Sequence, residues 1–159
     1  MEFKDIKEVV YYLDTINDVD NPHYNHCIEH SFVNLEWYRE ILKKVLEDKP
    51  KRVIDVGSNL NQYGFLFANE GIEYIGIDNS TTIPYDGEFM QPVITDKIKY
   101  IQADYRKIAD QFKNDVIISC LCVGYLVKIE EVKAKRLIIN DLDEKGYAIA
   151  KEVKLNESI

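Results

Sequence analysis

Polar residues that could bind a nucleoside follow four predicted strands of this sequence. The first of these strands runs into the segment 55–64, which reads Asp-Val-Gly-Ser-Asn-Leu-Asn-Gln-Tyr-Gly. In an open sheet of parallel strands, ligands bind beyond the carboxyl ends of the strands, where the strand order reverses. The candidate binding residues at these ends are Asp55, Gly57, Ser58, Asn59, Asn61, Asp78, Asn79, Asp104, Tyr105 and Ser119.

The turn after the first strand is expected to curl around a ligand. Gly57 has no side chain to block a close approach to the backbone, and asparagines such as Asn59 and Asn61 tolerate a left-handed conformation. The amides of the turn would then face a carboxylate or phosphate at a helix N-terminus. The spacing does not match the Walker phosphate loop, because Phe65 stands where that loop requires lysine.

Acidic residues after the second and third strands suit the other parts of a nucleoside. Asp78 can accept hydrogen bonds from both ribose hydroxyls, each of about 1.5 to 3 kcal/mol. Asp104 can accept from an amino group of a base, with Tyr105 and Ile77 packed on its faces. Each residue taken singly also fits a plain turn or helix cap. Their occurrence together at four strand ends favours a binding site.

Alternating apolar patterns predict the elements that position these residues. Helices are expected at 3–16, 32–46, 63–69, 108–112 and 129–142, and strands at 53–56, 74–77, 98–102, 116–120 and 147–153. Strands that alternate with helices pair in parallel through right-handed crossovers. We therefore predict an α/β fold with an open, mostly parallel sheet of about five strands, helices on both faces and two N-terminal helices. A competing interpretation makes 137–140 a strand in a hairpin with 147–153, because short apolar runs fit both structures.

Length and charge narrow the class of protein. The 159 residues predict a single domain, 1–159, with an N-terminal helical segment at 1–50 and a sheet core at 51–159. The net charge of −8, without a basic run, argues against nucleic-acid binding. No apolar run is long enough to cross a membrane, no signal peptide is recognisable, and three cysteines make no disulfide framework. A cytoplasmic protein without membrane contacts is the expectation.

A cluster of possible metal ligands lies in the N-terminal segment. His23, His26, Cys27 and His30 would share helix faces, and imidazole and thiolate groups bind zinc. The spacing matches no standard zinc finger, and no fourth strong ligand is evident, so we predict no metal site. The histidines are then capping, hydrogen-bonding or solvated residues. Cys120 and Cys122 are expected to be buried structural thiols.

The segment 52–154 resembles the class I S-adenosylmethionine-dependent methyltransferases, which have a Rossmann-like fold. The similar stretches are 53–57, 74–78, 101–104, 115–119 and 143–149. The resemblance implies an enzyme that transfers a methyl group from S-adenosylmethionine to a small molecule or a protein. It implies that Gly57 and its loop hold the methionine part of the cofactor, Asp78 the ribose, Asp104 and Tyr105 the adenine, and that Ser119 faces the transferable methyl group.

The same resemblance implies that the N-terminal segment forms a lid over the cofactor, with Tyr24 or His30 touching it. Tyr24 and Tyr125 are candidates for lining the acceptor pocket, and no catalytic residue is identified. The sequence departs from the family at Asn59 and Asn61, where glycines are usual, and it ends before the family's antiparallel hairpin. The expected open sheet edge could pair two copies in a homodimer. These departures support an alternative, a noncatalytic methyltransferase-like module for binding or interaction.

Overall fold

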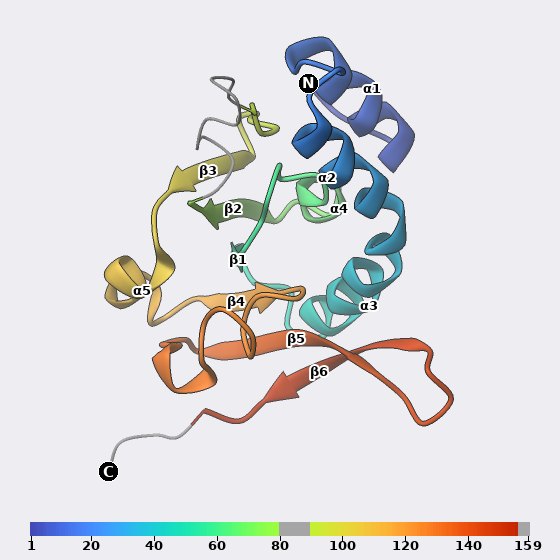
Figure 1. Cartoon of the computed structure of the whole chain (residues 1–159). Helices are drawn as coiled ribbons and strands as arrows, with labels where there is room; N and C mark the ends of the chain where they lie inside the picture. The colour runs from blue at the N-terminus through green and yellow to red at the C-terminus, as the bar shows by residue number, and fades with distance from the viewer. Residues whose placement is uncertain (80–89, 156–159) are drawn as a thin grey trace.

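A computed structural model gives the structure of the chain, and it describes residues 1–79 and 90–155 (Figure 1). The helices are α1 (Ile6–Ile16), α2 (Pro22–Val33), α3 (Leu35–Leu46), α4 (Gly64–Ala68) and α5 (Tyr105–Ile108), with short 3₁₀ helices η1 (Ala109–Phe112) and η2 (Ile129–Glu131). The strands are β1 (Arg52–Val56), β2 (Glu73–Asp78), β3 (Ile98–Gln102), β4 (Val116–Ser119), β5 (Arg136–Leu142) and β6 (Ala148–Val153). Residues 80–89, within the predicted long connection before β3, lie outside the described residues.

The strands form one sheet in the order β3-β2-β1-β4-β5-β6. Every neighbouring pair is parallel except β5 and β6, which are antiparallel. The order reverses beside β1, because β2 lies on one side of it and β4 on the other. The prediction of an open, mostly parallel α/β sheet is confirmed, and the predicted site falls at the reversal point.

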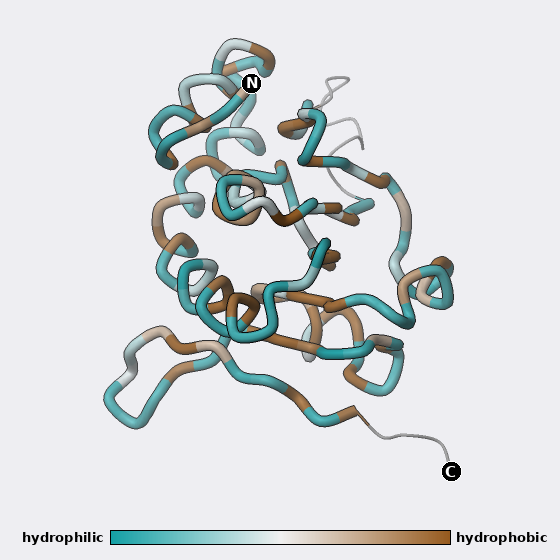
Figure 2. Tube along the Cα trace, turned by 180° about the vertical axis from the view of Figure 1, so that it is seen from behind, coloured by the Kyte–Doolittle hydropathy of each residue, from teal (hydrophilic) through white to brown (hydrophobic). Residues whose placement is uncertain are grey.

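Apolar side chains cover both faces of the central strands. The strand register aligns them in two rows, Val53 with Tyr74 and Val116, and Ile54 with Ile75 and Ile117. The first row packs in the core beneath the N-terminal helices, and the second packs on the opposite face of the sheet. In Figure 2 the tube has brown stretches along these strands, whereas the turn between β5 and β6 is mostly teal. Strands buried on both faces explain the continuous apolar runs in the sequence.

Three helices precede the sheet instead of the two expected. The predicted helix at 3–16 is α1, and the predicted helix at 32–46 is mostly α3. The additional helix, α2, starts at Pro22, where the Asn21 side chain accepts hydrogen bonds from the His23 and Tyr24 amides. The sequence did not reveal it, because the apolar residues of α2 do not gather on one face of the helix as those of α1 and α3 do. Asn34 ends α2 and begins α3.

The C-terminal region follows the competing interpretation, and the predicted helix at 129–142 is wrong. Only η2 is helical there, and β5 pairs with β4 on one side and β6 on the other. The apolar side chains of β5 alternate between the two faces of the sheet, with Leu137 in the core on one face and Ile138 in the core on the other, which helical spacing would not allow. Arg136 donates to Glu152 at 2.7 Å across the hairpin, and the Trp37 indole donates to the Asp141 carbonyl at 2.8 Å. The expected absence of a hairpin is therefore also wrong, and β6 is an edge strand.

None of the helices in the described parts of the chain has the length and apolar character needed to cross a membrane.

Candidate functional site

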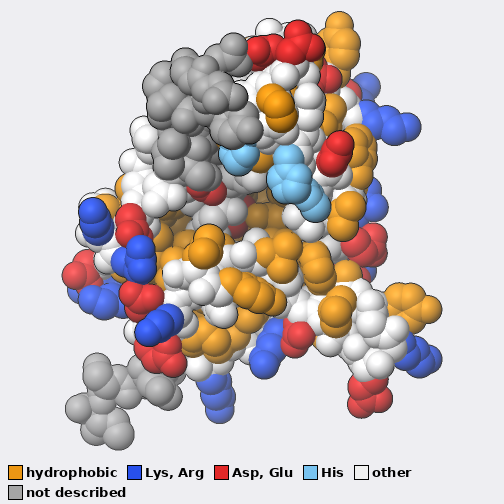
Figure 3. All heavy atoms as spheres, in the orientation of Figure 1, with side chains coloured by type: hydrophobic (Ala, Val, Ile, Leu, Met, Phe, Trp, Pro, Cys, Tyr) orange, Lys and Arg blue, Asp and Glu red, His pale blue; other side chains and the backbone are white. Residues whose placement is uncertain are grey.

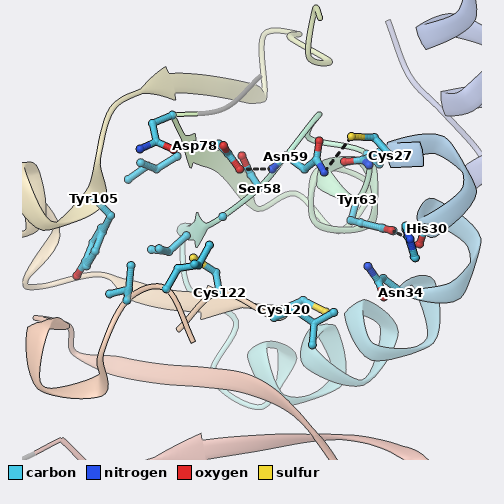
Figure 4. A pocket seen from close by; sticks show the side chains of 18 of the residues that line it. Cys27, His30, Asn34, Ser58, Asn59, Tyr63, Asp78, Tyr105, Cys120 and Cys122 are labelled. Atoms are coloured by element: carbon cyan, nitrogen blue, oxygen red, sulfur yellow. Dashed lines mark hydrogen bonds between the residues drawn. The ribbon is translucent and has the colours of Figure 1, made fainter. Parts of the chain in front are cut away.

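A cavity of about 600 Å³ opens at the carboxyl ends of β1, β2 and β4, and α2 forms one of its walls (Figure 4). Figure 3 shows the same face of the molecule, where histidine side chains lie on one side of the hollow and hydrophobic side chains on the other. The predicted residues that line the cavity are Gly57, Ser58, Asn59, Asp78, Asn79, Asp104 and Tyr105. Seven of the ten predicted residues therefore lie around one cavity.

The turn after β1 has the left-handed backbone expected from its asparagines. Gly57, Asn59 and Asn61 have φ angles of 83°, 52° and 57°. The Gly57 and Ser58 amides donate to the Ile77 carbonyl at 2.8 and 3.3 Å, so they continue the pairing with β2 instead of facing a ligand. That part of the prediction is wrong.

The next amide of the turn fixes the acidic residue at the end of β2. The Asn59 amide donates to Asp78 Oδ2 at 2.8 Å, and both residues line the cavity. This bond joins the ends of two neighbouring strands and orients the Asp78 carboxylate at the cavity wall. The two asparagines thus preserve the backbone path that glycines would otherwise supply.

The missing side chain of Gly57 makes room for a cysteine. A Cβ atom at Gly57 would lie 2.5 Å from Cβ of Cys122, which belongs to the connection after β4. The absence of a side chain at Gly57, predicted to admit a ligand, therefore also admits Cys122. Burial raises the pKa of the Cys122 thiol to about 11, and that of the neighbouring Cys120 to about 12, so both stay protonated at neutral pH.

Three predicted site residues do not line the cavity, because their polar groups are buried and hydrogen-bond to other parts of the protein. Asn61 is buried and donates to the carbonyls of Val93 and Lys99 at 3.0 and 3.1 Å. Ser119 is buried, and its hydroxyl accepts from the Val123 amide at 2.9 Å. The third residue is Asp55, which is fully buried and does not line the cavity. These positions correct the expectation that each would contact a cofactor.

Asp55 is a fully buried carboxyl group in the central strand β1. Its Oδ2 atom accepts a hydrogen bond from the Tyr38 hydroxyl at 2.9 Å and another from the Tyr74 hydroxyl. Burial raises the pKa of Asp55 to about 7, although both tyrosine hydrogen bonds favour the charged form and lower it. Because Tyr38 lines the cavity, Asp55 is linked to the cavity only through this tyrosine among its described partners.

The third strand end carries an ion pair. The Asp104 carboxylate caps α5 by accepting from the Arg106 amide at 3.0 Å, and it binds the Arg106 guanidinium at 2.9 and 2.7 Å. Hydrogen bonding to Arg106 lowers the pKa of Asp104. The Tyr105 ring lines the cavity, while its hydroxyl donates to the Lys133 carbonyl at 3.3 Å. A ligand amino group at Asp104 would therefore share the carboxylate with Arg106.

Sequence reasoning missed most of the wall that α2 and α3 provide. His26, Cys27, His30 and Asn34 line the cavity from these helices. At one end of the cavity lie Asp78 and Tyr105, and at the other His30 and Asn34 (Figure 4). Their positions depend on how α2 packs against the sheet, which no local spacing reveals. His30 had been suggested only through the family resemblance.

Hydrogen bonds attach α2 to the turn after β1. The Tyr63 hydroxyl donates to the Ser31 carbonyl at 2.8 Å, and the Gln62 amide donates to the Ser31 hydroxyl at 3.1 Å. Asn59 Nδ2 donates to Cys27 Sγ at 3.5 Å. These bonds hold α2 in place as a wall of the cavity, and the lid interpretation stays a prediction.

The two tyrosines suggested for the acceptor pocket are not among its lining residues. Tyr24 is buried and donates to Asp14 at 2.6 Å. Tyr125 is 70% exposed and lies outside the cavity. The His26 and His30 rings meet edge to face at 4.4 Å, but the described residues contain no group of three or more His, Cys, Asp or Glu side chains that could hold a metal ion.

Comparison with known proteins gives a structural relationship only. No family model and no curated protein sequence matches the chain. A crystal structure of magnesium protoporphyrin IX methyltransferase (ChlM) from Synechocystis PCC 6803 with bound SAH is similar over 88% of this chain and 74% of that protein, with a TM-score of 0.53 and 14% identity. The chain has a methyltransferase fold. A structure of ChlM with bound SAM matches with a TM-score of 0.44 and 16% identity, covering 91% of this chain and 80% of that one.

Proposed function

We propose that this chain binds S-adenosylmethionine and transfers its methyl group to a small molecule or a protein. The observation that carries the proposal is the Asp78 carboxylate, which the Asn59 amide holds at the end of β2 on the wall of the cavity. The methyltransferase fold supports the choice of cofactor, because the ChlM structure that matches with a TM-score of 0.53 contains SAH.

The residues at the Asp78 end suit the adenosine part of this cofactor. A cavity of about 600 Å³ is within the usual range for sites of small ligands. A carboxylate offers about four lone-pair positions, so Asp78 can accept from ribose hydroxyls in addition to the Asn59 amide. Ile77 and Tyr105 line the adjoining wall and offer apolar surface to a base.

The opposite end suits the amino-acid part through polar side chains. His30 and Asn34 line this region, and the Asn59 side chain reaches toward it, where its Nδ2 donates to Cys27 Sγ at 3.5 Å. The side chains of Asn59 and Asn34 can both donate and accept hydrogen bonds, as an amino acid requires. We assign the methionine part of the cofactor to this end.

The chain's own residues bind the cofactor, position the methyl acceptor and accept the proton that the acceptor releases. When bound, S-adenosylmethionine supplies a methyl group on positively charged sulfur, and its transfer to a hydroxyl or amine displaces a proton from that acceptor. His26 lines the cavity and can take this proton on an imidazole nitrogen. Cys120 and Cys122 remain neutral thiols at neutral pH and do not compete as nucleophiles. Positioning of the acceptor supplies much of the remaining rate.

Calorimetric titration with S-adenosylhomocysteine tests the proposal. We expect saturable binding to the full chain, weakened at least about tenfold in Asp78→Asn because charge-assisted hydrogen bonds are lost. Asp20→Asn removes the same charge from an exposed turn and should leave the affinity unchanged. Absence of heat from the unaltered chain at millimolar ligand would contradict the proposal.

A noncatalytic interaction module is the second candidate. It is favoured by the internal use of the Gly57 and Ser58 amides and by the packing of Cys122 against Gly57. This candidate predicts no S-adenosylhomocysteine binding and pairing of two copies through the β6 edge. Sedimentation velocity would then show a homodimer, which Ala150→Pro should dissociate by removing a strand amide.

A further inference from the structure

We propose that the connection 121–127, between β4 and β5, binds the hydrocarbon part of an apolar, uncharged methyl acceptor at the mouth of the cavity. This assignment rests on the proposed methyl transfer and specifies the class of its acceptor. Backbone conformation, exposed apolar side chains and the charges of the cavity wall support it.

Leu121 has an unfavourable backbone conformation. Its φ angle is 63°, in the left-handed region that branched or bulky side chains rarely occupy. The Leu121 amide donates to Oδ1 of Asn140 at 2.9 Å, which holds this conformation from the neighbouring strand β5. Backbone strain of this kind persists where surrounding structure enforces it, and it is concentrated at binding and catalytic sites.

The connection presents apolar side chains to solvent beside the cavity. Leu121, Tyr125 and Leu126 are 43%, 70% and 78% exposed. Leu121, Leu126 and the buried Val127 line the cavity, while Tyr125 is the neighbour of Leu126 outside it. Hydrophobic side chains gather along this side of the hollow in Figure 3. Exposed apolar groups that adjoin a ligand cavity indicate a surface that a ligand covers.

The connection is also tightly folded. The Cys122 carbonyl accepts from the amides of Tyr125, Leu126 and Val127 at 3.0, 2.9 and 3.2 Å. The Gly124 amide donates to the Val127 carbonyl at 2.6 Å. The exposed side chains therefore project from a hydrogen-bonded turn, which reduces the entropy lost on binding.

The charges of the wall exclude an anionic acceptor. Arg106 is the only Lys or Arg among the described lining residues, and Asp104 already binds it at 2.7 Å. The lining carboxylates, Asp78 and Asp104, would repel an anion. His26 also lines the cavity and is not among the residues assigned to the methionine part, so its imidazole can contact the hydroxyl or amine that receives the methyl group. An uncharged apolar molecule with one hydroxyl or amine could therefore contact both the connection 121–127 and the polar wall of the cavity.

Binding of the uncharged fluorescent probe N-phenyl-1-naphthylamine tests this site in the full chain. We expect saturable binding with or without S-adenosylhomocysteine. Leu126→Ser and Leu121→Asn should each weaken it at least about fivefold, because each removes apolar contact area. Asparagine at 121 retains a residue that tolerates the left-handed backbone. The matched control is Leu142→Ser, since Leu142 is 53% exposed and does not line the cavity.

The same samples, titrated with S-adenosylhomocysteine, separate the two proposals. Both site variants should retain the cofactor-product affinity of the unaltered chain. If S-adenosylhomocysteine binds and the probe does not, the apolar site is overturned and the proposed function stands. If the probe binds and S-adenosylhomocysteine does not, the assignment to a methyl acceptor falls together with the proposed function.

Two further results would overturn the site itself. Equal weakening of probe binding by Leu142→Ser would show that the probe binds exposed leucines without selectivity. A dimer in sedimentation velocity that Leu126→Ser converts to a monomer, without probe binding to either, would show that the connection is an interface between two copies.

Discussion

Two connections leave the carboxyl ends of adjacent strands and line the same cavity, yet they achieve a left-handed backbone with different residues. The turn after β1 uses Asn59 and Asn61, whereas the connection after β4 uses Leu121. Asn61 is completely buried and its amide group satisfies two carbonyls, while Leu121 is 43% exposed. Asparagine adopts this conformation at low cost, and leucine does not. The turn after β1 is therefore part of the structural framework. The connection after β4 retains backbone strain that packing does not explain.

The comparison predicts a severe stability loss in the scaffold. Gly76→Ala would place a Cβ atom 1.9 Å from Oδ1 of Asn61 and 2.4 Å from the Ser58 hydroxyl. Because this position lies inside the sheet, we expect a loss of about 3 kcal/mol in unfolding free energy, measured by urea denaturation. Combining Gly76→Ala with Ser58→Gly should recover part of the loss. A loss below about 1 kcal/mol would show that the turn is not rigid.

A pH-dependent effect is expected from Asp55, in the strand that leads into the same turn. Its pKa is about 7 in the folded chain, against the usual 3.8 of an aspartate, so between these pH values only the folded state retains the proton. Stability contributed by this group is complete below pH 4 and is lost as the pH rises through 7. Between pH 4 and 8, the unaltered chain should lose up to about 4 kcal/mol more than Asp55→Asn, because each unit of pKa difference corresponds to about 1.4 kcal/mol.

Urea denaturation across this pH range measures that difference. Comparison with Asp55→Asn removes the contributions of other titrating groups, and asparagine can still accept both tyrosine hydrogen bonds at one oxygen. Parallel pH profiles for the two proteins would contradict the prediction. They would show that Asp55 is charged in the folded state.

The smallest effect concerns the strained connection itself. Leu121→Gly should raise the unfolding free energy by about 1 kcal/mol, because glycine adopts positive φ without steric cost. Asn59→Gly is the matched control at the first turn and should change stability by only a few tenths of a kcal/mol. Thermal and urea unfolding measure both variants. Destabilisation by Leu121→Gly would mean that the leucine contributes packing instead of strain.

Local chemistry made part of the architecture predictable. Strands β1 to β4 are short, largely apolar segments that end in polar turns. The asparagines at 59 and 61 made the left-handed backbone of the turn after β1 predictable. The run at 129–142 was ambiguous because its apolar residues suit a helix face as well as a doubly buried strand. Pairing with β4 and β6 decided in favour of β5, and this is long-range information.

Site residues that directly follow a strand could be predicted from the sequence. The direction of individual side chains and the placement of α2 could not. Asp78 and Tyr105 line the cavity as expected, since the end of a parallel strand fixes which edge they occupy. The spacing could not show that Asn61 turns toward the interior or that Arg106 binds Asp104. His30 and Cys27 were beyond local reasoning, because their helix reaches the sheet through Tyr63, Gln62 and Asn59.

The contact between α3 and the β5–β6 hairpin has a consequence for biosynthesis. The Trp37 indole and the Asp141 carbonyl are 104 residues apart in the chain, and α3 packs on both strands of the hairpin. A nascent chain emerging from the ribosome therefore exposes the apolar side of α3 until residue 153 has been made. Contacts this distant slow folding and leave a window for aggregation. Chaperone binding to α3 during translation would protect the chain through that window.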